Sequence, residues 1–233
     1  CGILLPVSAL PSPYGIGSLG KAAYEFIDFL EEAGQSYWQM LPVGPTSYGD
    51  SPYQSFSTYA GNPYFIDLDM LCEDGLLTQE EIEAVDWGED AGRVDYAKIY
   101  EHRFGLLEAA TRRGFDRDCE QVEAFSSENP WLADYAMFMA LKRHFGMRAW
   151  TQWEDEDIRL RCPEAMERYR RELAPDIRLF TYIQYLFFQQ WEKMRAYAKE
   201  KGIGIIGDLP IYVAMDSADV WANPECFQLD EKN

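Results

Sequence analysis

The sequence predicts an α/β fold with parallel strands and a mainly helical insertion. Three short apolar runs, at 2–7, 37–43 and 203–213, indicate strands, and helix-periodic segments lie between them. The stretch 73–177 is instead charged and helix-periodic throughout. A chain of 233 residues can bury a substantial core, so we expect one large domain that carries an insertion.

The first predicted unit is a strand, a helix and a second strand. The run GILLPV at 2–7 is bounded by a turn-rich stretch, which predicts a fully buried strand. Apolar residues recur at helical spacing over 22–33, and Gly34 stands where a C-terminal cap is expected. The run YWQMLPV at 37–43 then predicts a second strand, parallel to the first.

The insertion is predicted to consist of helices separated by loops around 86–92, 114–118 and 126–130. One of these helices should open after Asn129 and Pro130, because an apolar face begins at Leu132. We therefore divide the chain into three parts. They are an N-terminal barrel part with a substrate loop (1–72), a helical insertion (73–177) and a barrel helix with the third strand and its following loop (178–233).

The last part begins with a long amphipathic helix that should end at Gly202. The run IGIIGDLPIYV at 203–213 follows and predicts a third buried strand, since unbroken aliphatic runs are typical of parallel strands covered on both faces. Eight strand–helix units close a (β/α)8 barrel, so about three strands correspond to an incomplete (β/α)8 barrel, or TIM barrel, with a mainly helical insertion. Cys at position 1 and the polar end FQLDEKN lead us to expect truncation at both ends.

Composition excludes several classes of function. Lys and Arg total 21 against 40 Asp and Glu, a net charge of −19 that would repel nucleic acid. The chain has no apolar run of the roughly 20 residues that cross a bilayer, so we predict no membrane partner and a cytoplasmic location. The five cysteines are an odd number without a CxxC pair and are interpreted as reduced thiols, with no metal and no cofactor.

The segment 48–71 is the first candidate binding element. It is too long for a plain connector and is rich in Tyr, Ser, Asn, Pro and Gly, a mixture that suits a carbohydrate cleft. Its candidate sugar-binding side chains are Tyr48, Asp50, Ser51, Tyr53, Gln54, Tyr59, Asn62 and Tyr64. From composition alone, a well-packed Ω-type loop with its aromatic side chains facing the core is the favoured alternative.

Asp208 is the second candidate, because an ionised carboxylate inside the apolar run GIIGDLPIYV needs a partner. At the carboxyl end of a barrel strand it would face the mouth, where it can hold sugar hydroxyls or a neighbouring Arg. A structural Asp bound by backbone amides is an equally good interpretation. Asp216, Ser217, Asp219 and Trp221 follow at the same predicted rim and are weak candidates individually.

Several motifs together resemble the amylomaltase (disproportionating enzyme) family of 4-α-glucanotransferases. They are GILLPVSALPSPYGIGSLG, YWQMLPVGPTSYGDSPYQSFSTYAGNPYFIDLD, WLADYAMFMALK, YLFFQQW and IIGDLPIYVAMDSADVWANPECFQLDE, in family order and spacing. The resemblance implies a (β/α)8 barrel with helical insertions. It also implies transfer of α-1,4-glucan segments between maltooligosaccharides, starch or glycogen-type glucans, by a glycosyltransferase of carbohydrate metabolism.

The resemblance also suggests residue roles. Tyr53 and Asp208 match positions that line the donor-sugar subsite, and Ser51 and Asp50 belong to the same motif as Tyr53. Tyr48 matches a loop aromatic on the glucan-binding surface, and Tyr100 is a further candidate there.

The family's catalytic residues have no counterpart in this chain. Its nucleophile is an Asp in an R-x-D-H motif, followed by a Glu acid/base and a further Asp, and all three are expected beyond Asn233. The segment RVDY at 93–96 imitates the nucleophile motif but lacks the His, so Asp95 is not expected to be a nucleophile. We therefore predict part of a glucanotransferase that is inactive alone. The alternatives are a hydrolytic α-glucosidase or amylase relative and a non-catalytic carbohydrate-binding protein.

Overall fold

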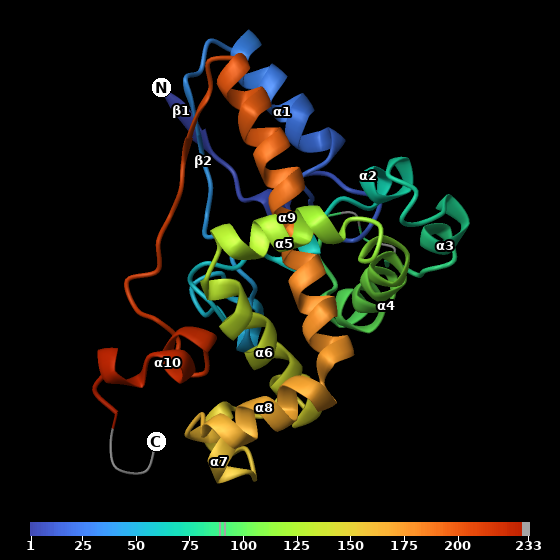
Figure 1. Ribbon diagram of the computed structural model, residues 1–233. Coiled ribbons are helices and arrows are strands. Elements are labelled where there is room, and N and C mark those ends of the chain that lie inside the picture. The colour runs from blue at the N-terminus through green and yellow to red at the C-terminus, as the bar shows by residue number, and fades with distance from the viewer. Residues whose placement is uncertain (89, 91, 230–233) are drawn as a thin grey trace.

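The computed structural model describes residues 1–88, 90 and 92–229, and combines a small parallel sheet with many helices (Figure 1). The described strands are β1 (Gly2–Leu4), β2 (Tyr37–Gln39) and β3 (Gly204–Ile206). They lie in the order β1-β2-β3, and Trp38 pairs with Ile3 on one side and Ile205 on the other. The prediction of three parallel strands is confirmed.

Two helices contact the sheet. They are α1 (Lys21–Glu32) and the C-terminal part of α9 (Ala174–Glu200), whose other turns pack on the helical part. The other helices are α2 (Leu68–Glu73), α3 (Gln79–Glu83), α4 (Tyr96–Gly114), α5 (Cys119–Glu128), α6 (Trp131–His144), α7 (Glu156–Arg159), α8 (Pro163–Glu172) and α10 (Ala218–Ala222). None of the helices in the described ranges is long and apolar enough to span a bilayer.

The strands are shorter and more exposed than the sequence predicts. Each has three residues, and Pro6 and Pro42, which have no backbone N–H, follow closely after β1 and β2. Leu4 and Ile206 on the two outer strands are 52% and 43% exposed, and Ile211 is 91% exposed. The prediction of fully buried strands at 2–7 and 203–213 is therefore wrong in the described structure, because no described element covers the face of the sheet opposite to α1 and α9.

Helices α1 and α9 cover one face of the sheet side by side (Figure 1). Trp38 at the centre of β2 is fully buried, meets the ring of Phe26 edge-on at 5.0 Å and donates its indole N–H to the Leu5 carbonyl over 2.8 Å. Farther out, the Tyr197 hydroxyl donates to Asp28 over 2.6 Å. Both helices end as predicted: Gly34 and Gly202 follow their last turns in the left-handed region, at φ 66° and 72°.

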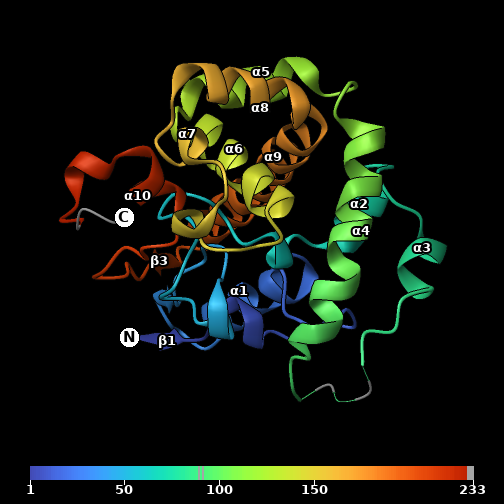
Figure 2. The same cartoon turned by 90° about the horizontal axis from the view of Figure 1, so that it is seen from below.

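The helical part forms a separate layer, with α5, α6, α7 and α8 gathered on the side opposite to β1 and α1 (Figure 2). The predicted helix after Asn129 and Pro130 is confirmed as α6, although Asn129 bonds to Phe125 and Trp131 rather than to the free amides of the helix. Helix α9 begins at Ala174 and passes the predicted division at 177/178 without a break. The helical part and the sheet region thus share one long helix.

Two glutamines of α9 fix the second half of the segment 48–71. The Gln184 amide accepts from the Gly61 N–H over 2.7 Å and donates to the Gly61 carbonyl over 2.9 Å. Gln190 makes the same pair of bonds with Asp67, at 2.6 and 3.1 Å. Both side chains are buried, so each amide satisfies a backbone N–H and C=O that water cannot reach. We call these contacts the glutamine clamps.

Replacing Gln184 with Leu is expected to lower the free energy of unfolding by about 2–4 kcal/mol, because it leaves two buried backbone groups without partners. Urea denaturation followed by tryptophan fluorescence measures this change. Gln121→Leu, at an exposed position of α5, is the matched control and should change stability by less than about 0.5 kcal/mol. Equal effects of the two substitutions would contradict the clamp.

Candidate functional site

The loop that follows β2 folds back on itself and presents residues 48–53 at its tip. Thr46 and Ser55 form an isolated antiparallel bridge, and the Ser47 N–H donates to the Gln54 carbonyl over 2.9 Å. The chain reverses through Gly49 and Asp50, both in the left-handed region at φ 78° and 56°. This reversal orients Ser51 and Tyr53, and the Tyr53 N–H donates to the Ser51 hydroxyl over 3.3 Å.

Tyr53 and Asp208 meet where the loops after β2 and β3 approach one another. The Tyr53 hydroxyl donates to Asp208 Oδ2 over 2.8 Å, although 155 positions separate the two residues. Tyr53 is 46% exposed and Asp208 is partly exposed, so both groups are accessible from solvent. The hydrogen bond to the Asp208 carboxylate raises the pKa of Tyr53, because a phenolate beside that negative charge is disfavoured.

Two further contacts join the same loops. The Ala218 N–H donates to the Phe56 carbonyl over 2.8 Å. The carboxylate of Asp219 accepts from the Thr58 N–H over 2.9 Å and from the Thr58 hydroxyl over 3.0 Å. The loops therefore run as a connected pair from Tyr53–Asp208 to Thr58–Asp219.

Asp208 lines two concave regions, one along β3 and α9 and one between the loops that follow β2 and β3. One is an open hollow of about 870 Å³, and the other is a smaller cavity of about 170 Å³ that Tyr59, Phe187 and Trp191 help to line. Aromatic faces beside a carboxylate provide both stacking surfaces and a hydroxyl acceptor, the combination that a sugar ring needs. The residues lining the larger hollow include Met40, Pro42, Trp191, Ile205, Gly207 and Asp208.

Asp50 and Ser51 of the GDSPYQS motif lie on the inner side of the loop tip, whereas Gln54 is exposed. Asp50 lines a cavity of about 100 Å³ with Val7, Pro42, Thr46 and other residues, and its Oδ1 has neither solvent contact nor a hydrogen-bond partner. Burial raises the pKa of Asp50. Ser51 is partly buried beside it. The backbone of Tyr48 belongs to a short 3-10 turn, and its side chain lies outside the described part of the structure.

Tyr100 belongs to a different aromatic group, in the first two turns of α4. Its ring is 44% exposed and contacts those of Tyr64 and Tyr96, with centroids 5.6 and 6.1 Å away. Tyr96 also lines the cavity that contains Asp50. The structure thus brings Tyr53 and Asp208 into contact and leaves Tyr100 on the adjoining helical surface.

Other acidic residues considered from the sequence have structural contacts. Asp95 caps α4, where its carboxylate accepts from the Ala97 and Lys98 N–H groups at 3.1 and 3.3 Å. Asp216 and Asp219 bind Lys142 and Thr58, and Trp221 is buried. Within the described ranges, no group of His, Cys, Asp and Glu side chains is arranged to hold a metal ion.

Sequence reasoning did not identify Lys142, Gln184 and Gln190, which organise the loops. All three are buried, and each lies among the apolar residues of a helix. A polar residue inside an apolar stripe is the available sequence signal, since such a side chain must find a partner.

Comparison with known proteins gives consistent matches along the chain. A family profile described as 4-alpha-glucanotransferase matches residues 5–233. The chain is 53% identical over 231 residues to a 4-alpha-glucanotransferase of Streptococcus pneumoniae, and 48% identical over 227 residues to that of Clostridium butyricum. These alignments cover 98% and 97% of the chain but 46% of each relative, so the chain spans about half the length of the relatives it matches.

A solved structure is similar throughout the chain. It is an amylomaltase from Streptococcus agalactiae in complex with acarbose, with a TM-score of 0.97 and 43% sequence identity. The match covers 99% of this chain and 47% of that one. The arrangement of strands, loops and helices described above is therefore shared with about half of that protein.

Removing the charge of Asp208 should lower the pKa of Tyr53 toward the usual tyrosine value, because its hydrogen bond and the nearby negative charge hold that pKa up. NMR titration of ¹³Cζ-labelled tyrosine in Asp208→Asn and in the unchanged chain measures the difference. Asp219→Asn is the control, since Asp219 binds Thr58 in the same pair of loops. A Tyr53 titration that does not respond to Asp208→Asn would contradict the contact.

Proposed function

Because the chain belongs to the 4-alpha-glucanotransferase family, we propose that it forms the N-terminal half of an enzyme that transfers α-1,4-glucan segments. The donors and acceptors in this proposal are maltooligosaccharides and starch or glycogen-type glucans. The observation that carries it is the Tyr53–Asp208 contact between the loops after β2 and β3, beside an aromatic-lined cavity. The net charge of −19 and the five free cysteines further support a cytoplasmic enzyme without nucleic-acid or membrane partners.

We propose that the three strands are the first three of a (β/α)8 barrel. Their parallel order supports this, as do the exposed outer strand β3 and the 870 Å³ hollow beside it, where further elements can pack. In this arrangement 1–72 and 178–233 contribute to the barrel, and 73–177 forms the helical insertion. The continuous helix α9 connects the insertion to the barrel.

We assign substrate binding to the residues around the paired loops. In this assignment Asp208 accepts hydrogen bonds from hydroxyls of the donor sugar. Tyr53 stacks its ring on the same sugar and forms a hydrogen bond to it through its hydroxyl. Ser51 and Asp50 shape the loop tip that presents Tyr53. Tyr48 and Tyr100 contribute to a glucan-binding surface nearby, which the exposed ring of Tyr100 supports.

The proposed reaction is a retaining double displacement, which requires two carboxyl groups about 5–5.5 Å apart. One attacks the anomeric carbon, and the other protonates the leaving oxygen and later activates the acceptor. The proposal assigns both to the part of the enzyme that follows the 233 residues, since the chain contains no R-x-D-H motif. In this proposal the 233 residues bind and orient the glucan.

The 233-residue chain alone is expected to have no transferase activity on maltotriose, because it lacks the nucleophile and the acid/base. The protein extended to the length of its relatives should convert maltotriose to glucose and longer maltooligosaccharides. Chromatography of the products measures both. Glucose and maltose without longer products from the extended protein would indicate a hydrolase instead, and activity of the short chain would overturn the assignment of the catalytic residues.

In the extended protein, Asp208→Ala should lower kcat by roughly 10²-fold, or about 3 kcal/mol in activation free energy, and should raise KM less. The reason is that a carboxylate bound to hydroxyls of the distorting donor sugar interacts most strongly in the transition state. Tyr53→Phe keeps the ring and should lower kcat less than Tyr53→Ala. Steady-state kinetics with maltotriose measure these values, and an Asp208→Asn enzyme with an unchanged kcat would contradict the assignment.

A further inference from the structure

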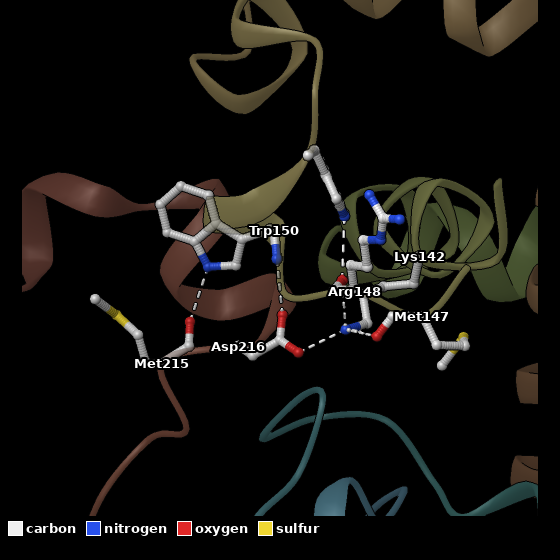
Figure 3. A network of polar contacts seen from close by, with 7 residues as sticks. Lys142, Met147, Arg148, Trp150, Met215 and Asp216 are labelled. Atoms are coloured by element: carbon white, nitrogen blue, oxygen red, sulfur yellow. Dashed lines mark hydrogen bonds and ion pairs between the residues drawn. The ribbon is translucent and has the colours of Figure 1, made fainter. Parts of the chain in front are cut away.

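A buried ammonium group of the helical part holds the loop that follows β3. Lys142 on α6 is 1% exposed, and its Nζ contacts three acceptors (Figure 3). These are the Met147 carbonyl at 2.9 Å, the Arg148 carbonyl at 2.8 Å and Asp216 Oδ2 at 2.5 Å. An ammonium group has three protons, so this environment satisfies all of them.

The same loop has a second attachment to the helical part through Trp150. The Trp150 N–H donates to Asp216 Oδ1 over 3.1 Å, and its indole N–H donates to the Met215 carbonyl over 2.8 Å (Figure 3). Both carboxylate oxygens of Asp216 are therefore bound. We call the contacts among Lys142, Trp150, Met215 and Asp216 the lysine clasp.

Lys142 also contacts the loop that follows β2. Its Nζ lies 5.1 Å from the centre of the Phe56 ring, within the range of a cation–π interaction. The Phe56 carbonyl accepts from the Ala218 N–H, two positions after Asp216. A single buried charge thus touches both members of the loop pair that carries Tyr53 and Asp208.

The segment between β3 and the clasp depends on its two ends. At the first end, the Met40 N–H donates to the Ile206 carbonyl over 2.9 Å. Among the described residues, the backbone of 207–214 makes no hydrogen bond to another part of the chain, and the side chains of Leu209, Ile211 and Tyr212 are at least 80% exposed. The path of this segment, which contains Asp208, is therefore set by β3 at one end and, at the other, by the clasp together with Val213, which packs against the core.

We propose that Lys142 is a positioning residue for glucan transfer, which acts by fixing the two loops so that Tyr53 and Asp208 share one donor sugar. This proposal rests on the proposed function. A buried ion pair generally gains little stability over apolar side chains of similar size, so its effect is expected in the geometry that it imposes. The helical insertion thereby contributes to the substrate site without touching the substrate.

A double-mutant cycle in the extended protein tests this proposal. Lys142→Met removes the charge and retains a flexible apolar side chain, and it should lower kcat for maltotriose about 10-fold. If Lys142 acts through Asp208, the double variant Lys142→Met/Asp208→Ala should be within about 3-fold of Asp208→Ala alone. If Lys142→Met folds poorly, Asp216→Asn replaces it in the cycle, because it weakens the clasp more gently. Its effect on kcat should be non-additive with that of Asp208→Ala in the same way.

Thr111→Val is the control, because Thr111 is also a buried polar residue of the helical part and its hydroxyl donates within α4 to the Leu107 carbonyl. It should lower the melting temperature but leave kcat within about 2-fold at temperatures well below the transition. If the losses of kcat caused by Lys142→Met and Asp208→Ala add in the double variant, or if Lys142→Met leaves kcat unchanged, Lys142 is not a positioning residue. Transferase activity of the unsubstituted extended protein would still support the proposed function.

The crystal structure of the extended Lys142→Met protein gives a readout that is independent of activity. We expect the Tyr53 hydroxyl and Asp208 Oδ2, 2.8 Å apart here, to separate beyond hydrogen-bond distance. An unchanged distance would refute the proposal whether or not the parent enzyme transfers glucan.

Discussion

The backbone of residues 61–67 runs through the interior of the molecule, where its polar groups must be satisfied by protein atoms. The glutamine clamps bind the N–H and C=O groups of Gly61 and Asp67, and Arg103 donates to the carbonyls of Tyr64 and Ile66. An unpaired buried backbone group costs about 1–3 kcal/mol, so this segment can lie here only if α4 and α9 supply these side chains. The two helices therefore fix the chain between the loop tip at 48–53 and α2.

This constraint explains why α6 and α9 carry polar residues inside their apolar faces. Gln184, Gln190 and Lys142 each lose water on burial, and each recovers the lost hydrogen bonds only in one arrangement of the loop it contacts. Apolar residues at these positions would pack against many arrangements with similar energy. The polar contacts thus select one path for each loop, which is the property that a binding site needs.

Much of the fold follows from the sequence alone, because helices and their ends depend on local spacing. The glycines at 34 and 202 and the start of α6 are where periodicity and capping rules predict them. Strand burial is different. An apolar run shows that a strand can be buried, but it does not show which elements of the fold cover that strand. Leu4 and Ile206 lie with Gln39 on the face of the sheet opposite to α1 and α9, so their exposure depends on which elements cover that face. The Tyr53–Asp208 contact likewise joins residues 155 positions apart, and only the motif resemblance suggested that they belong together.

The Tyr53–Asp208 hydrogen bond cannot itself hold the two loops together. Both groups face solvent, where water competes for the same donor and acceptor, and a glucan hydroxyl that binds Asp208 would compete as well. The separation of these side chains must therefore be set by contacts that neither water nor substrate can replace. The bond from the buried Ala218 N–H to the Phe56 carbonyl and the contacts of the buried Lys142 provide this anchoring. A site that exchanges its own hydrogen bonds for those of a sugar needs one set of groups to bind the sugar and another to hold the loops. The binding groups can then change partners while the backbone that carries them stays in place.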